Sequence, residues 1–236
     1  MKPLFFAHPI SMPRPLPRTA AGDEALRRDL AQFCRRAAEL MRAAALVDGS
    51  QPGLLLPDDF AEARRRGLAA ARRVLPGSES GKPQIAYFRT LTGSGLCAAE
   101  ETVPALADRV WLLEDRCGLA DSYLRAVVDA ALQQGAACIL CPSPLHRDRL
   151  EAVFLPGAGA AFLSRGAAGK AQYDGARLVH LDRIPDAERR RDLRLSIQED
   201  GRIARRLVEK AAQTLAAAEI LRDLADDPCT PHGKRI

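Results

Sequence analysis

The sequence lacks any long hydrophobic run. No stretch approaches the roughly 18 consecutive apolar residues of a transmembrane helix, and Pro3, Pro9, Pro13, Pro15 and Pro17 interrupt the first residues before a signal-type apolar region can form. With 47% apolar residues, the chain can bury a core, which excludes intrinsic disorder as its main state. We therefore expect a folded, cytoplasmic protein that makes no contact with membrane.

Lysine is scarce too, with only 5 Lys against 30 Arg. The net charge is +5, but the Arg residues are spread along the chain among Asp and Glu, whereas a nucleic-acid binder usually concentrates its positive charge. Nucleic acid is therefore not an expected partner. Two Arg runs, at 64–66 and 189–191, fall on predicted helices, where we expect a solvated face paired with nearby acids. An Arg-rich module that docks nucleic acid or protein is an alternative.

Cysteine and histidine show no metal-binding pattern. The six Cys are irregularly spaced, and the chain is too long to need a disulfide framework. Cys138 and Cys141 match C-x-x-C, but they lie in an apolar run typical of a strand, where positions i and i+3 face opposite sides. The four histidines, His8, His146, His180 and His232, are not within helical reach of one another. We expect no metal site.

Composition and periodicity divide the chain into five segments. Apolar residues recur at spacings of three and four over 23–48 and 186–224, which predicts long helices. Pro, Gly and Ser gather in a linker. The predicted segments are a Pro-rich segment 1–22, a helical hairpin 23–75, the linker 76–84, an α/β core 85–184, and a long helix and tail 185–236.

The core segment alternates between strand and helix patterns. Strands are predicted at 85–91, 109–114, 137–141, 150–155, 160–163 and 178–181, with helices near 98–107 and 122–134 and a hairpin turn at 157–159. Strand–turn–helix–strand with short connections is typical of a parallel sheet. The sequence thus predicts an α/β fold with a parallel sheet and long flanking helices.

The turn 114–122 is the best candidate for a binding site. It follows an apolar strand and precedes an amphipathic helix, which is the context of a phosphate-binding loop. The pattern G-x-x-x-x-G-K-[ST] places its glycines on Asp115 and Ala120, its lysine on Asp121 and its hydroxyl residue on Ser122. Gly118 lies inside the loop. The strand–turn–helix context of a phosphate-binding loop is present, but most of the residues that bind phosphate in such a loop are not.

From about residue 87 to 224 the chain resembles an uncharacterised family of ATPase-like P-loop proteins of Gram-positive bacteria, which have two tandem repeats. The resemblance rests on RTLTGSG, on the apolar strand and loop, on a strand ending near Cys141, on LEAVFLPGAGAAFLS, on VHLD and on the long final helix. It implies a P-loop NTPase-like fold in which 23–75 is the helical end of a first repeat. It also implies a degenerate nucleotide site formed by Arg116, Cys117, Gly118, Leu119, Ala120, Asp121 and Ser122.

The departures from that family argue against hydrolysis. Asp121 reverses the charge of the lysine, which at about 4 Å and an effective dielectric near 20 changes the interaction with phosphate by roughly 8 kcal/mol. Where the family has an acidic residue on the side of the site that holds the metal, this chain has Ser164. We therefore expect a pseudo-ATPase with no catalytic residues, no cofactor and no metal. Asp121 and Ser122 are also favourable helix-start residues, which gives the loop a purely structural interpretation.

Besides the Arg-rich module, two alternatives for the loop stay open. The chain could be a working nucleotide-binding protein that uses ATP with magnesium, its missing cation supplied from elsewhere. It could instead retain only an anion site at Arg116, Gly118 and Ser122. His146 follows a predicted strand end, where a surface-loop role is favoured over catalysis. Because half of a two-repeat ancestor would leave one surface uncovered, we expect self-association or a protein partner.

Overall fold

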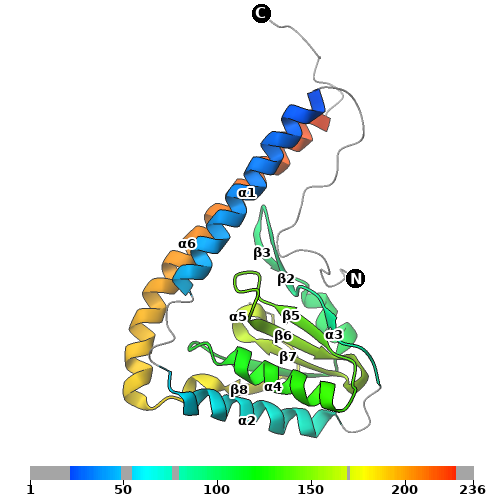
Figure 1. Cartoon of the computed structure of the whole chain (residues 1–236), viewed down its shortest axis with the longest axis vertical. Coiled ribbons are helices and arrows are strands. Elements are labelled where there is room, and N and C mark those ends of the chain that lie inside the picture. The colour runs from blue at the N-terminus through cyan, green and yellow to red at the C-terminus, as the bar shows by residue number, and fades with distance from the viewer. Residues whose placement is uncertain (1–21, 49–54, 76–79, 169–170, 227–236) are drawn as a thin grey trace, which may run out of the picture.

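A computed structural model describes residues 22–48, 55–75, 80–168 and 171–226. The expected Pro-rich segment, part of the linker and the C-terminal tail with Cys229 and His232 lie outside the described residues. The described chain consists of an α/β body and a pair of long helices that extends away from it (Figure 1). The α/β class expected from the sequence is confirmed.

The body is built on a six-stranded sheet in the order β1-β5-β6-β7-β4-β8. Pairs β1/β5, β7/β4 and β4/β8 are parallel, whereas β6 runs antiparallel to both its neighbours. The sheet is therefore mixed, which corrects the expected parallel sheet. The reason is that β6 and β7 are joined by a tight turn, and a short turn can only join antiparallel strands. The strands are β1 (Gln84–Ile85), β4 (Arg109–Glu114), β5 (Ile139–Pro142), β6 (Leu150–Leu155), β7 (Ala160–Ser164) and β8 (Arg177–His180).

The segment before β4 differs most from expectation. The single strand predicted at 85–91 is divided between β1 and β2 (Arg89–Thr92), and β2 forms a separate hairpin with β3 (Gly95–Ala98). The turn is possible because Gly95 adopts a φ of 118°, which side chains disfavour. The helix predicted near 98–107 is correspondingly short, with a 3-10 turn η2 (Glu100–Thr102) followed by α3 (Val103–Leu106).

Two apolar cores lie on opposite faces of the sheet. On one face, α4 (Ala120–Gln133) covers the strands and α2 (Pro57–Val74) packs against α4. Trp111 stacks on Phe162 there, with ring centroids 4.8 Å apart. The other face buries a second cluster that includes Phe88 and Phe154. Cys138 belongs to the first core and Cys141 to the second, as the strand pattern predicted for the C-x-x-C pair.

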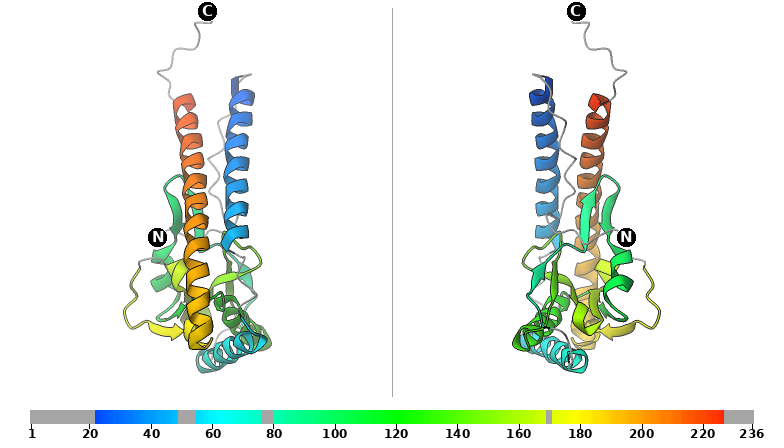
Figure 2. Two further views of the ribbon diagram at one scale, coloured as in Figure 1. Left: turned by 90° about the vertical axis from the view of Figure 1, so that its left-hand side faces the viewer. Right: turned by 90° about the vertical axis from the view of Figure 1, so that its right-hand side faces the viewer.

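The long helices α1 (Gly22–Asp48) and α6 (Ala187–Asp226) run antiparallel, side by side (Figures 1 and 2). Small residues at their contact, including Ala37 and Ala211, are fully buried, and Leu91 of the β2–β3 hairpin completes the cluster. The helices expected to form a hairpin over 23–75 therefore pack on different partners. The apolar stripe of α1 faces α6, whereas the small residues of α2 face α4. Within the described residues, none of the helices combines the length and apolar character that spanning a membrane requires.

Short elements complete the body. The turn η3 (Pro156–Ala158) ends at Gly159, whose φ of 57° confirms the tight turn expected at 157–159. The helix α5 (Arg165–Ala168) follows β7, and η4 (Leu181–Arg183) follows β8. All these connections after β7 and β8 leave the sheet at the same edge as the loop after β4, because the three strands are parallel.

The contact between α2 and α4 depends on a glycine. A Cβ atom on Gly67 would collide with the backbone of Tyr123: the carbonyl oxygen is the nearest atom, and the carbonyl carbon lies 3.1 Å away. We expect Gly67→Ala to lower the free energy of unfolding by about 1–3 kcal/mol, the usual cost of overpacking. Urea denaturation measures this change.

The matched control is Gly201→Ala in α6, where a Cβ atom would meet nothing within 4 Å. Since alanine is the better helix former, this variant should be stabilised by up to about 1 kcal/mol. Equal effects of the two substitutions would show that the close approach of α2 and α4 is not tight.

Candidate functional site

The candidate loop joins the end of β4 to the start of α4. It comprises residues 115–119, because β4 ends at Glu114 and α4 begins at Ala120. The strand β4 has a parallel neighbour on each side, β7 and β8. The loop thus emerges at the carboxyl edge of the sheet, where ligands bind in open α/β proteins. The structure places all seven predicted site residues, 116–122, together at this edge.

The side chain of Asp115 binds the backbone of its own loop. Its Oδ1 accepts hydrogen bonds from the N–H groups of Cys117 (3.0 Å) and Gly118 (2.9 Å), and its Oδ2 accepts one from Ala120 (2.7 Å). Gly118 makes this possible with a φ of 88°. Burial raises the pKa of Asp115, while the backbone N–H donors act in the opposite direction. The N–H groups that would face a bound phosphate are therefore occupied by a carboxylate of the protein.

Asp121, which the phosphate-loop pattern aligns with its lysine, also has partners within the protein. Its Oδ2 pairs with Arg125 Nε at 2.8 Å, and its Oδ1 accepts a hydrogen bond from Leu150 N at 2.8 Å. Asp121 thus ties α4 to the start of β6. Asp121 lies in the first turn of α4, as expected of a helix-start residue. The hydrogen bond to a backbone N–H of that turn comes from Asp115, whose carboxylate binds Ala120 N.

A cavity of about 440 Å³ lies over the loop. Its wall includes Ser122 and Cys117 from the loop region, and α1 and α6 contribute Asp48 and Asp200 to it. Burial, followed by the nearby carboxylates of Asp115 and Asp182, raises the pKa of the Cys117 thiol to about 11. The charged lining residues are four aspartates and two arginines, namely Asp48, Asp115, Asp121, Asp200, Arg116 and Arg149. An acidic wall of this kind disfavours a polyphosphate.

Two further sequence candidates have local partners. Ser164, expected at the acidic metal-side position, accepts a hydrogen bond from Ala167 N at 3.2 Å across the start of α5. His146 Nε2 lies 3.1 Å from Asp48 Oδ2. His146 does not line the cavity over the loop, although Asp48 does. Neither residue joins the loop in a catalytic arrangement among the described residues.

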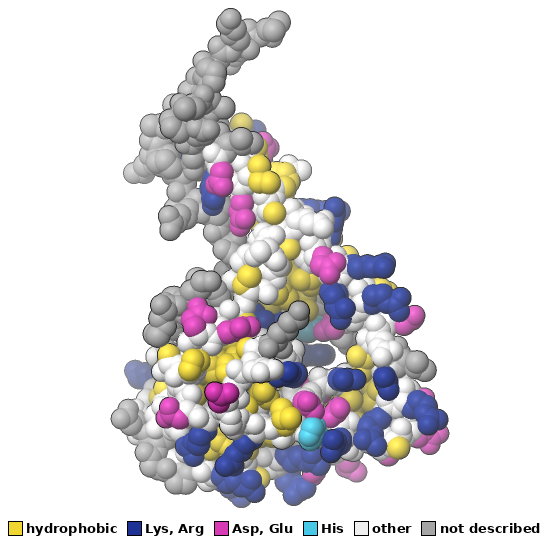
Figure 3. Space-filling view, turned by 180° about the vertical axis from the view of Figure 1, so that it is seen from behind, with side chains coloured by type: hydrophobic (Ala, Val, Ile, Leu, Met, Phe, Trp, Pro, Cys, Tyr) yellow, Lys and Arg dark blue, Asp and Glu magenta, His cyan; other side chains and the backbone are white. Residues whose placement is uncertain are grey.

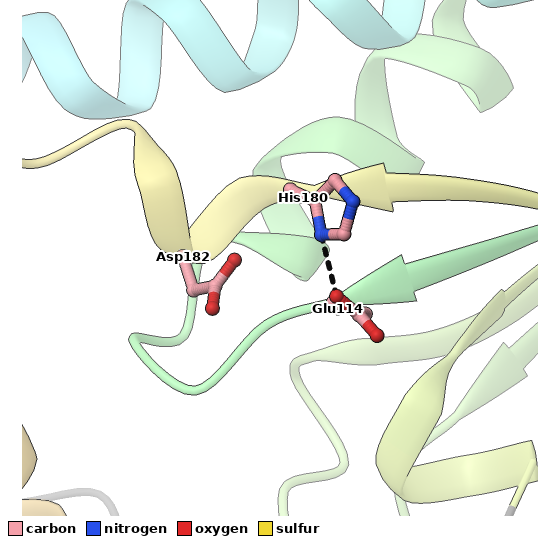
Figure 4. Close-up of side chains that lie close together, drawn as sticks. All are labelled: Glu114, His180 and Asp182. Carbon is pink, nitrogen blue, oxygen red and sulfur yellow. Dashed lines mark ion pairs between the residues drawn. The ribbon is translucent and has the colours of Figure 1, made fainter.

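The structure also brings together three residues that the sequence reasoning did not combine. Glu114 ends β4 and His180 ends β8, and the two are register partners in adjacent parallel strands. Figure 4 shows the His180 ring facing Glu114, with Nδ1 2.5 Å from Oε2, and the Asp182 carboxylate directed toward the pair. The available signal was a ligand-type residue at the end of the predicted strand 109–114 and another one residue before the end of the predicted strand 178–181. The strand order, which sequence spacing does not show, was needed to pair them.

The Arg run 64–66 lies on an accessible surface. Lys and Arg side chains gather over the lower half of the molecule, where α2 and the first half of α6 lie, with Asp and Glu among them (Figure 3). Arg64 pairs with Asp129 at 3.0 Å, and Arg65 and Arg66 both pair with Glu62 at 2.7 Å. The expectation of a solvated face paired with nearby acids is confirmed for this run.

No protein-family profile, curated protein or solved structure matches this chain. Its candidate site is therefore defined by its own geometry. That geometry comprises a strand–loop–helix unit at the carboxyl edge of an α/β sheet, a carboxylate bound inside the loop, and an acidic cavity above it.

The loop should depend strongly on Asp115. Replacing Asp115 by Ala leaves three backbone N–H groups without their acceptor, and we expect the free energy of unfolding to fall by about 2 kcal/mol or more. Asp115→Asn, which keeps the volume and one acceptor oxygen, should fall between Ala and the natural residue. Chemical denaturation followed by circular dichroism measures the differences.

Asp129→Ala is the matched control, because Asp129 also lies on α4 but forms an exposed pair with Arg64. Exposed pairs contribute at most about 1 kcal/mol, so this variant should unfold close to the natural protein. If Asp115→Ala were no more destabilised than Asp129→Ala, the loop would not depend on its internal carboxylate.

Proposed function

We propose that this chain is a P-loop NTPase-like protein whose nucleotide site is closed by its own side chains, and that it acts by binding a partner rather than by hydrolysis. The observation that carries the proposal is the Asp115 carboxylate on the loop N–H groups at 2.7–3.0 Å. A phosphate-binding loop depends on those N–H groups being open to the ligand. A carboxylate already held there excludes a phosphate both by volume and by charge.

The surrounding charges support the same proposal. A P-loop lysine contacts the β- and γ-phosphates, whereas Asp121 places a carboxylate at that position and engages it with Arg125 and Leu150. The magnesium side has Ser164, whose hydroxyl binds Ala167 N. Phosphate loop, lysine position and metal side thus all lack the groups that hydrolysis requires. The resemblance to ATPase-like P-loop proteins motivates the fold assignment, and the loss of these groups motivates the pseudo-ATPase.

Calorimetric titration with ATP, with and without magnesium, tests the proposal. We expect no saturable binding by the natural protein. The double variant Asp115→Gly, Asp121→Lys opens the N–H groups and restores the cation, and it should gain measurable affinity for Mg-ATP. A thermal melt of the variant establishes that it is folded.

The possible results separate the two parts of the proposal. Saturable Mg-ATP binding by the natural protein, lost in Ser122→Ala, would contradict the closed site and favour the working nucleotide-binding protein. A folded double variant that does not bind ATP would contradict the P-loop-like assignment while leaving the natural protein without nucleotide affinity.

We propose a second copy of this chain as the partner, bound through the α1–α6 pair. Two packed helices bury only the interface between them and leave their other faces in solvent. In a four-helix bundle, by contrast, the helices enclose a shared core. The pair leaves Ile220 62% exposed, and Phe33 and Leu221 line a groove between the helices. Two such pairs brought together would bury these apolar side chains in a four-helix bundle.

Sedimentation equilibrium at micromolar concentration should therefore show a dimer. Ile220→Glu places a charge in the apolar contact and should shift the protein to monomer, whereas Gln133→Glu adds the same charge at an exposed position of α4, in the α/β body, and should not. A monomeric natural protein would contradict this mode of self-association.

A further inference from the structure

We propose that Glu114, His180 and Asp182 form a binding site for a divalent transition metal of the Zn²⁺ class. One ligand atom from each residue lies within 4.8 Å of the other two. Glu114 and His180 end adjacent parallel strands, and Asp182 follows two residues later in η4 (Figure 4). The three side chains thus converge from rigid backbone at the carboxyl edge of the sheet.

The site goes beyond the proposed function because it uses none of the residues 116–122. It lies beside the candidate loop, on the strand end from which the loop departs. Loss of nucleotide binding and presence of this metal site are independent properties of the chain.

An unsatisfied oxygen is the observation that points to a cation. Asp182 Oδ1 is buried and has no hydrogen-bond partner among the described residues. A carboxylate oxygen shielded from water without a donor is costly, and buried charges in proteins are paired or coordinate metals. A metal ion held between Asp182 and the Glu114–His180 pair would supply the missing positive charge.

The charges of the three ligands match a divalent ion. Two carboxylates and a neutral imidazole carry a total charge of −2, which a divalent cation neutralises. The guanidinium of Arg66 contacts this region: its Nη1 donates to the His180 backbone oxygen at 3.4 Å, and Arg66 also pairs with Glu62. Arg66 thus contacts the backbone of His180 rather than its ring, so the imidazole can still face the other two ligands.

The geometry needs only a small adjustment. Ligand atoms about 2.1 Å from a tetrahedral Zn²⁺ are about 3.4 Å from one another, whereas His180 Nδ1 and Glu114 Oε2 are 2.5 Å apart. The pair must therefore separate by about 1 Å, which side-chain rotation at two partly exposed residues allows. The contact between them in the absence of metal is the hydrogen bond that the ion replaces.

The imidazole selects the class of metal. Nitrogen ligands suit Zn²⁺ and other transition metals, whereas Mg²⁺ and Ca²⁺ prefer oxygen alone. Three protein ligands leave a fourth tetrahedral position for water or a further ligand, as in open zinc sites.

Calorimetric titration of the full chain with ZnCl₂, after dialysis against a chelator, tests the site. The chain also contains six cysteines and three further histidines that could bind Zn²⁺. The informative quantity is therefore the difference in Zn²⁺ stoichiometry and affinity between the natural protein and each variant. We expect the natural protein to bind one equivalent that His180→Ala and Asp182→Asn lose, with an affinity reduced at least about 100-fold, since even outer partners of metal ligands are worth 10–100-fold. Asp182→Asn is nearly isosteric, so it keeps the site testable if His180→Ala fails to fold.

His146→Ala is the matched control. His146 forms the other histidine–carboxylate pair of the described residues, with Asp48, and it belongs to no three-residue cluster there. This variant should retain the equivalent that His180→Ala loses. Bound Co²⁺ should likewise show visible absorption in the natural protein and in His146→Ala, and much less in Asp182→Asn.

Three results would overturn the proposal. The first is unchanged Zn²⁺ stoichiometry and affinity in both His180→Ala and Asp182→Asn. The second is an equal loss in His146→Ala, which would indicate adventitious binding by surface histidines. The third is tighter binding of Mg²⁺ than of Zn²⁺ at the same residues, which would contradict the choice of a transition metal.

Discussion

The hydrogen bonds from the loop backbone to the Asp115 carboxylate determine what the rest of this structure can do. They bring a chain that leaves the buried strand β4 directly into the first turn of α4. In a phosphate-binding loop the corresponding backbone N–H groups bind an external anion. Here the anion is covalently part of the chain, so the loop is complete without a ligand and its geometry serves the fold.

That constraint explains the arrangement of the charges around the loop. Asp121 does not need a phosphate partner, because it joins α4 to β6 through Arg125 and the backbone of Leu150. The cavity above is lined by the end of α1 and by a segment in the first half of α6, and it carries more carboxylates than guanidinium groups. An ATPase would need the opposite balance. The acidic edge of the sheet is instead suited to a cation, and the adjacent cluster of Glu114, His180 and Asp182 offers a suitable set of ligands.

Much of the fold followed from local pattern. The strands at 109–114 and 150–155 were predicted with the observed bounds, and the long helices within a residue or two, because continuous apolar runs and three–four periodicity are strong signals. The segment 85–107 was predicted poorly. A two-residue strand and a small hairpin around Gly93 and Ser94 depend on cross-strand pairing and on packing against α6. Such contacts produce no periodic pattern of apolar residues in the sequence. The reversed β6 was missed for the same reason, although the tight turn after it was predicted.

The sequence by itself determined the α/β class and the position of the candidate loop, and it showed that this loop does not have the lysine and paired glycines of a phosphate-binding loop. Each of these follows from the pattern of consecutive residues. Only the tertiary structure decided that Asp115 fills the loop, that α1 pairs with α6 rather than with α2, and that His180 meets Glu114, 66 positions earlier in the chain. The physical reason is that such contacts depend on the order of the strands in the sheet and on which apolar faces pack against each other. Both are properties of the packed chain as a whole.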